Sequence, residues 1–84
     1  MFRLIFAPPA ERELRKLPEE ARQALVERLD TLVQNPFNSH LRIKKLRPPY
    51  LGYRLRVGQY RSLFQIEADM IIVYSVKHRK DAYK

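Results

Sequence analysis

The fold is decided by residues 52–66, which read GYRLRVGQYRSLFQI. Apolar side chains alternate there with Arg54 and Arg56, and the alternation resumes at Tyr60 after a two-residue break that begins with Gly58. A period of two is typical of a half-buried β-strand, and glycine suits the first central position of a two-residue type II′ turn. The stretch therefore predicts a β-hairpin.

The two-residue turn determines which side chains of the hairpin face each other: Val57 and Tyr60, Arg56 and Arg61, Leu55 and Ser62, and Arg54 and Leu63. Arg56 and Arg61 are thus direct neighbours, and Arg54 shares their face. Like charges directly opposite each other destabilise an antiparallel pair by up to about 1 kcal/mol. We therefore expect this face to bind an anion. The alternative is a surface on which the arginines simply extend into water.

Patterns on either side of the hairpin predict an α+β fold. They indicate strands at residues 2–6, 41–47 and 70–76, and helices at residues 10–16 and 18–34. We expect the N-terminal strand and the two-helix hairpin to be followed by three to four mainly antiparallel strands, with both helices on one face of the sheet. That face is the apolar side of the hairpin: Tyr53, Leu55, Val57, Tyr60 and Phe64. Core packing also explains the apolar stripe of the longer helix, for which docking on a membrane or a partner is the alternative.

Length and composition exclude several classes of protein. We expect one domain spanning residues 1–84, because a chain of 84 residues supports a single small core. The lack of cysteine and the wide spacing of His40 and His78 argue against disulfides, a thiolate nucleophile and a zinc site. The N-terminal apolar run is too short for a membrane span or a signal peptide. Since no cofactor motif is present, we expect neither a metal nor a cofactor.

The net charge of +8 comes entirely from the second half of the chain. Residues 1–40 contain six basic and six acidic side chains, whereas residues 41–84 contain eleven basic and three acidic ones. This asymmetry favours a phosphate-bearing partner, nucleic acid before an anionic membrane or an acidic protein. Lys44, Lys45 and Arg47 are candidates for phosphate contact, although basic residues on an edge strand also prevent aggregation.

Catalysis with these residues is feasible on RNA. The RNA 2′-hydroxyl can attack the adjacent phosphorus, so the protein need only position the phosphate, stabilise the developing negative charge and help to move two protons. Guanidinium groups suit the second task because they bind phosphate oxygens two at a time and stay charged. Tyr83 is a candidate for stacking on a base, and docking against the protein is its alternative role.

Two motifs resemble the RelE branch of the RelE/ParE toxin superfamily, whose members are the toxins of toxin–antitoxin pairs. They are Y-R-x-x-x-G-x-Y-R at residues 53–61 and H-R-x-x-x-Y at residues 78–83. The resemblance covers nearly the whole chain and implies a RelE-like α+β domain. It also implies a cytoplasmic endoribonuclease that enters the ribosomal A site and cleaves mRNA there without a metal, and a cognate RelB-like antitoxin as partner.

The resemblance also assigns roles to residues. Arg54 and Arg56 match two basic positions on the first hairpin strand, Arg61 matches the phosphate-binding arginine, Arg79 the basic residue after the last strand, and Tyr83 the tyrosine that stacks on the substrate base. We expect further RNA contacts from His78 and Lys80, in addition to the edge-strand residues.

Some relatives have lysines where this chain has Arg54 and Arg56, which leaves the general base unassigned. Histidine is the side chain whose charge changes near neutral pH, so His78 is the candidate, with a structural role as its alternative.

Two other functions remain compatible with the sequence. One is a ParE-like inhibitor of DNA gyrase that cleaves no RNA, and the other is an inactive homologue that only binds RNA. The arginines at residues 54–61 together with Arg79 and Tyr83 favour the ribonuclease.

Overall fold

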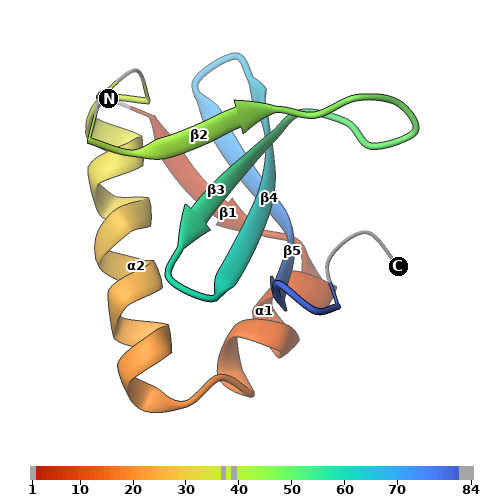
Figure 1. Ribbon diagram of the computed structural model, residues 1–84. Helices are drawn as coiled ribbons and strands as arrows, with labels where there is room; N and C mark the ends of the chain where they lie inside the picture. Colours follow the sequence, from red (N-terminus) through yellow and green to blue (C-terminus); the bar gives the residue numbers. More distant parts are fainter. Residues whose placement is uncertain (1, 37, 39, 82–84) are drawn as a thin grey trace.

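The computed structural model describes residues 2–36, 38 and 40–81 and has five strands and two helices (Figure 1). In chain order the elements are β1 (Arg3–Phe6), α1 (Pro8–Arg15), α2 (Glu19–Gln34), β2 (Arg42–Lys45), β3 (Tyr53–Val57), β4 (Tyr60–Glu67) and β5 (Met70–His78). The strands form one sheet in the order β1-β5-β4-β3-β2, in which β1 runs parallel to β5 and the other pairs are antiparallel. The α+β prediction is confirmed.

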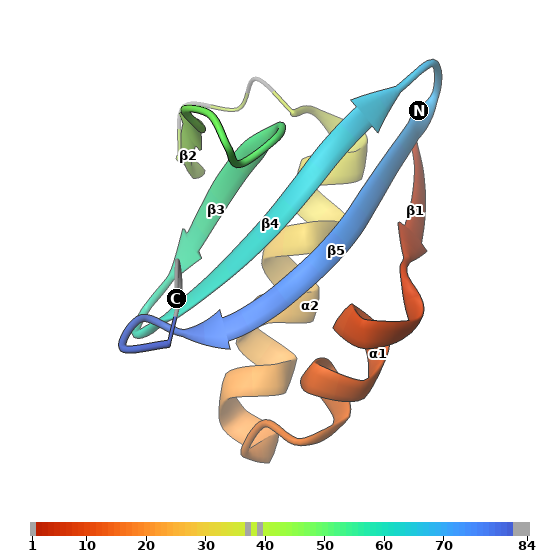
Figure 2. The same ribbon diagram turned by 90° about the vertical axis from the view of Figure 1, so that its right-hand side faces the viewer.

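The two helices lie on one side of the sheet. Figure 2 shows β3, β4 and β5 in front of α2, with α1 beside β5 beyond the end of β1. α1 begins at Pro8, two residues earlier than the sequence predicts, because proline at the first helical positions needs no N–H donor and has a suitable φ. Glu19 and Glu20 lie at the positive end of α2, which ends before Pro36. No helix within the described residues has the length and apolar character needed to cross a membrane.

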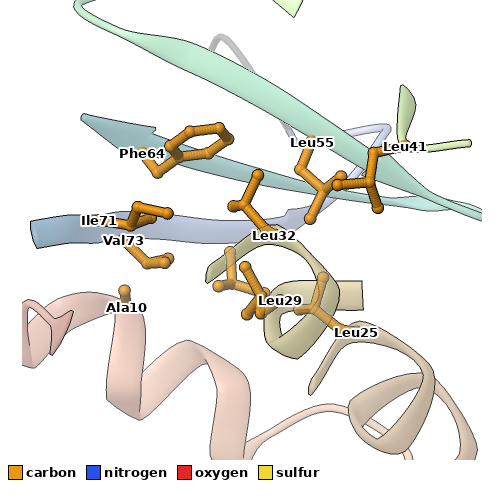
Figure 3. Packing of buried hydrophobic residues seen from close by; sticks show 10 residues of the cluster. Ala10, Leu25, Leu29, Leu32, Leu41, Leu55, Phe64, Ile71 and Val73 are labelled. Carbon is orange, nitrogen blue, oxygen red and sulfur yellow. The ribbon is translucent and has the colours of Figure 1, made fainter. Parts of the chain in front are cut away.

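The core lies between α2 and the apolar face of the sheet. Leu25, Leu29 and Leu32 of α2 have no exposed surface and point toward the strands (Figure 3). Opposite them, the buried sheet residues of the cluster are Leu55, Phe64, Ile71, Val73 and Val76. Tyr53 stacks on Phe64 with 5.5 Å between ring centroids. The predicted apolar side of the hairpin is thus the side that α2 covers.

The register of the central hairpin is confirmed. Arg56 pairs with Arg61, and the turn between the strands has a positive φ of 58° at Gly58. Ala68, in the next turn, is the only non-glycine residue with a positive φ among the described residues. Since φ is therefore positive only at the first central residue of the Gly58–Gln59 turn, the turn has the φ signs of type II′.

The last strand is longer than the sequence predicts and contains an irregularity. β5 continues through Lys77 and His78, two residues beyond the predicted end of the strand at residue 76. Leu63 pairs with Ser75 but Phe64 pairs with Val73, so Tyr74 is the extra residue of a β-bulge. The bulge shifts the alternation, which keeps Val73 and Val76 both buried and turns Lys77 toward the face that carries Arg61.

Gly52 closes the connection between β2 and β3 against the sheet, and we expect Gly52→Ala to destabilise the protein by more than about 2 kcal/mol. Its φ is +89°, and an added Cβ would lie 2.1 Å from the carbonyl oxygen of Phe64, which is a backbone atom that cannot easily move. The positive φ alone costs an alanine about 1–2 kcal/mol. Urea unfolding of the purified protein measures the difference.

Gly58→Ala is the matched control for Gly52→Ala. Gly58 also has a positive φ, but no described atom lies within 4 Å of its added Cβ. We expect this substitution to cost only the backbone term of about 1–2 kcal/mol. Equal losses for the two variants would show that the contact with Phe64 does not matter.

Candidate nucleic-acid interface

Four basic residues form a row across four strands on the face of the sheet away from α2. Arg42 of β2 pairs with Arg56 of β3, Arg56 pairs with Arg61 of β4, and Arg61 pairs with Lys77 of β5. Paired residues project from the same face, with Cβ atoms about 4.5–5.5 Å apart. The row therefore places four positive charges in direct succession.

A second pair of basic residues extends this surface. Lys44 pairs with Arg54, and their row continues through Leu63 to Ser75 on the same face. We call the six cations together the basic face: Arg42, Lys44, Arg54, Arg56, Arg61 and Lys77. Within the described residues, Arg42, Lys44 and Arg56 form no ion pair with a carboxylate. The charges of these three residues are thus available to an external anion.

The turn after β5 lies next to the row of four. The backbone N–H of Arg79 donates a hydrogen bond of 2.7 Å to the carbonyl oxygen of Gln59, in the turn between β3 and β4. Arg56 and Arg61 lie one residue pair away from that turn. Arg79 and Lys80 are exposed, so the structure brings both predicted residues to this end of the basic face. Tyr83 lies outside the described residues.

His78 lies on the side of the sheet that the helices cover. It pairs with Tyr60, and the two rings make an edge contact with 5.3 Å between centroids. Nδ1 of His78 accepts a hydrogen bond of 3.2 Å from the backbone N–H of Lys80. These contacts tie the imidazole to the turn that carries Arg79, and they do not bring it to the row of four.

Glu13 of α1 connects the helix to the exposed edge of β5. One carboxylate oxygen accepts a hydrogen bond of 3.0 Å from the N–H of Val76, and the other lies 2.6 Å from Nζ of Lys77. The hydrogen bond and charge of Glu13 raise the pKa of Lys77 above its ordinary value of 10.5. Lys77 therefore stays charged at neutral pH and is unsuited to act as a general base.

The ion pair predicts a pH-dependent contribution to stability. Because the pKa of Lys77 is higher in the folded protein than in the unfolded chain, the contribution is complete below pH 10.5 and is lost as the pH rises through the folded pKa. Since 45% of the Lys77 side chain is exposed, we expect the contribution to stay below about 1 kcal/mol. Glu13→Gln keeps an acceptor for Val76, so urea unfolding of this variant and wild type from pH 7 to 11.5 isolates the ion pair. The stability difference should be constant up to about pH 9.5 and shrink above pH 10.5; a flat difference would contradict the assignment.

A basic cleft of about 420 Å³ lies beside the basic face, where β2 ends and β3 begins. The predicted RNA-binding residues Lys44, Lys45 and Arg47 line it, together with Arg54 and two residues that the sequence did not single out, Pro48 and Tyr50. The structure thus brings the basic residues of the edge strand together with an arginine of the central hairpin.

Fold and site together define a small α+β protein that offers one strongly basic sheet face to an anionic partner. Residues 4–83 match a family described as the ParE toxin of the type II toxin–antitoxin system parDE. The chain is 31% identical to toxin RelE3 of Methanocaldococcus jannaschii over 96% of its own length and 94% of the relative. It therefore belongs to the RelE/ParE toxin superfamily and is a type II toxin of the RelE family.

Solved structures agree with this membership. The chain matches one chain of the RelB–RelE antitoxin–toxin complex from Methanococcus jannaschii with 32% identity and a TM-score of 0.77, covering 94% of each chain. It matches the Mycobacterium tuberculosis toxin–antitoxin complex RelBE2 with 30% identity and a TM-score of 0.78, covering 93% of this chain and 98% of that one. The intact Escherichia coli RelBE complex gives 26% identity and a TM-score of 0.77, with 93% and 96% covered.

Proposed function

We propose that this toxin is a ribosome-dependent endoribonuclease of the cytoplasm that cleaves mRNA in the ribosomal A site. The observation that carries the proposal is the row of Arg42, Arg56, Arg61 and Lys77, which places four positive charges side by side. Glu13 pairs with Lys77 at one end of the row, and a bound anion would relieve the repulsion along the rest of it. The RelE relatives support it, since their fold and size are those of this chain.

In the proposed reaction the RNA 2′-hydroxyl loses its proton and its oxygen attacks the adjacent phosphorus, while the 5′-oxygen leaves and takes up a proton from water. The products are a 2′,3′-cyclic phosphate and a new 5′-hydroxyl end. Arg54, Arg56 and Arg61 hold the non-bridging oxygens, on which negative charge grows in the transition state. Arg79, held beside the row through Gln59, stabilises the leaving oxygen. Stacking of a base on Tyr83 remains a prediction for a residue outside the described part of the chain.

The location of His78 favours a positioning role. Its ring contacts Tyr60 and accepts a hydrogen bond from Lys80, so it orders the turn that presents Arg79. The proton of the 2′-hydroxyl then leaves toward water or the ribosome rather than toward this imidazole. RNA contacts of Lys44, Lys45, Arg47 and Lys80 are part of the proposal.

The partner that controls the toxin is a RelB-like antitoxin. The chains that this protein matches in three solved complexes come from toxin–antitoxin assemblies of the RelB–RelE type. An acidic or amphipathic segment of the antitoxin would cover the basic face and exclude RNA from it.

A translation extract tests the proposal. Wild-type protein should leave cut messages whose new 5′ ends carry a hydroxyl, and the same mRNA without ribosomes should stay intact. Arg61→Ala/Arg79→Ala should abolish the cuts. Arg12→Ala/Lys16→Ala, which removes the same charge from exposed positions of α1 and its end, should cleave like wild type. Equal cleavage by both double variants would refute the site.

The family match gives one competing function. Because residues 4–83 match the ParE toxin family, inhibition of DNA gyrase without RNA cleavage is the second candidate. A gyrase supercoiling assay separates the two: inhibition together with intact messages in the translation extract would establish the ParE-like function. A toxin that binds ribosomes but changes neither readout would be an inactive homologue.

A further inference from the structure

We propose that the basic cleft is a second nucleotide-binding site, in which a base of single-stranded RNA stacks on Tyr50 while its phosphate binds Arg47, Lys44 and Arg54. The proposal rests on the proposed function and extends it from the scissile phosphate to a neighbouring nucleotide. A volume of about 420 Å³ is within the ~300–1,000 Å³ of small-ligand sites.

The chemistry of the cleft matches a nucleotide. Tyr50 and Pro48 offer flat apolar surface, and four cations surround them: Lys44, Lys45, Arg47 and Arg54. An aromatic ring within a basic groove is the combination with which proteins bind single-stranded nucleic acid of any sequence. A peptide of acidic residues would satisfy the cations, but it has no aromatic ring to stack on Tyr50.

The loop that carries Tyr50 is held in place by the fold. The N–H of Leu46 donates to the carbonyl of Gly52 at 2.9 Å, and the N–H of Tyr50 donates to the carbonyl of Arg47 at 3.0 Å. The hydroxyl of Tyr74 donates a 2.6 Å hydrogen bond to the carbonyl of Leu51. Since Tyr74 belongs to β5, its side chain must reach across β4 to this loop.

The cleft is continuous with the basic face. Arg54 lines the cleft and lies two residues before Arg56 on β3, a separation of about 7 Å. Figure 1 shows the connection between β2 and β3 extending from the sheet on the side away from α2. One RNA strand can therefore bind the row of four through one phosphate and the cleft through a neighbouring nucleotide.

Fluorescence anisotropy with a labelled 2′-O-methyl hexanucleotide tests the site, because this probe cannot be cleaved by 2′-hydroxyl attack. Tyr50→Ala should weaken binding roughly 5- to 150-fold, the usual loss for one stacked base. Tyr50→Phe, which keeps the ring, and Leu51→Ala, which changes an exposed neighbour in the same loop, should bind like wild type. Tyr74→Phe should weaken binding to a smaller extent by releasing the loop.

A matched probe with abasic sugars at all six positions identifies the stacking contact. Wild type and Tyr50→Ala should bind it equally, since it keeps the phosphates but has no bases. The proposal would be overturned if Tyr50→Ala weakened binding of both probes equally, or if it did not weaken binding of the hexanucleotide. It would also be overturned by a polyglutamate peptide that binds as tightly as the hexanucleotide and with the same dependence on Tyr50.

The translation extract tests the proposed function separately from the second site. If wild type cleaves messages but Tyr50→Ala binds the probe normally, the ribonuclease proposal is supported and the second nucleotide-binding site is contradicted. If wild type cleaves no messages but Tyr50→Ala binds the probe weakly, the second site is supported and the ribonuclease proposal is contradicted.

Discussion

Arg56→Ala is expected to lower the rate of message cleavage about 100- to 1,000-fold while the folded domain becomes up to about 1 kcal/mol more stable. Arg56 has a like charge on each side, Arg42 and Arg61, and forms no ion pair within the described residues. Its removal therefore relieves repulsion in the free protein. Loss of one hydrogen-bond donor to the charge of the transition state typically lowers the rate about 100- to 1,000-fold.

The opposite signs of the two effects distinguish a functional arginine from a structural one. Single-turnover cleavage on programmed ribosomes gives the rate, and urea unfolding gives the stability. Arg56→Lys keeps the charge but loses the two-pronged geometry of the guanidinium group. Its stability should therefore equal that of wild type, and its cleavage rate should lie between those of Arg56→Ala and wild type. If Arg56→Ala is both slower and less stable than wild type, Arg56 supports the fold, and the functional role assigned to the row is contradicted.

Arg42 provides the control within the same row. It lies on the edge strand β2, farther from the turn that carries Arg79, and it has Arg56 as its cross-strand neighbour. Arg42→Ala should relieve repulsion in the same way but lower the rate less than about tenfold. An equal loss of rate for the two variants would mean that the row acts through total charge alone.

The sequence predicts the central hairpin and its arginines well because a two-residue turn fixes the register. Arg61, the partner of Arg56 in β4, follows from counting outward from Gly58 and Gln59. The connection from β2 to β3 is longer and irregular, so counting cannot place Arg42 opposite Arg56. The alternation of residues 41–47 was the available signal, since it gives Arg42 and Lys44 a common face.

The bulge explains why Lys77 escaped prediction. Counting from the turn at Ala68 without interruption would place Val76 opposite Arg61 on the exposed face. The extra residue, Tyr74, instead pairs Lys77 with Arg61 and keeps Val76 buried at 2% exposure. Val73 and Val76 of MIIVYSV are three residues apart, so strict alternation would place them on opposite faces of the sheet. Two valines at this spacing are the sequence signal that indicates the bulge.

Tyr50 and Glu13 could not be found from local pattern at all. Tyr50 joins the cleft because the connection of residues 46–52 folds back on itself, and Glu13 reaches β5 because β1 pairs with only the first part of that strand. Both placements depend on contacts between segments far apart in the sequence.

Binding of RNA to the basic face is expected to depend steeply on salt. If four or five phosphates are neutralised, raising KCl from 50 to 200 mM should weaken binding of the uncleavable hexanucleotide roughly 50- to 130-fold, because single strands release about 0.7 counterions per contact. Arg42→Ala/Lys44→Ala removes two of the six cations of the basic face. The slope of log affinity against log salt should then become shallower by about 1.4.

Arg12→Ala/Lys16→Ala separates the arrangement of charge from its amount. Both double variants lower the net charge of +8 by two, but Arg12 and Lys16 belong to α1 and its C-terminal end, outside the basic face. If RNA responds to net charge, the two variants should change the slope equally. If RNA binds the rows across β2 to β5, only Arg42→Ala/Lys44→Ala should change it. Equal slopes would therefore contradict the interface even if the toxin cleaves RNA, since the six aligned cations would then contribute no more than any others on the surface.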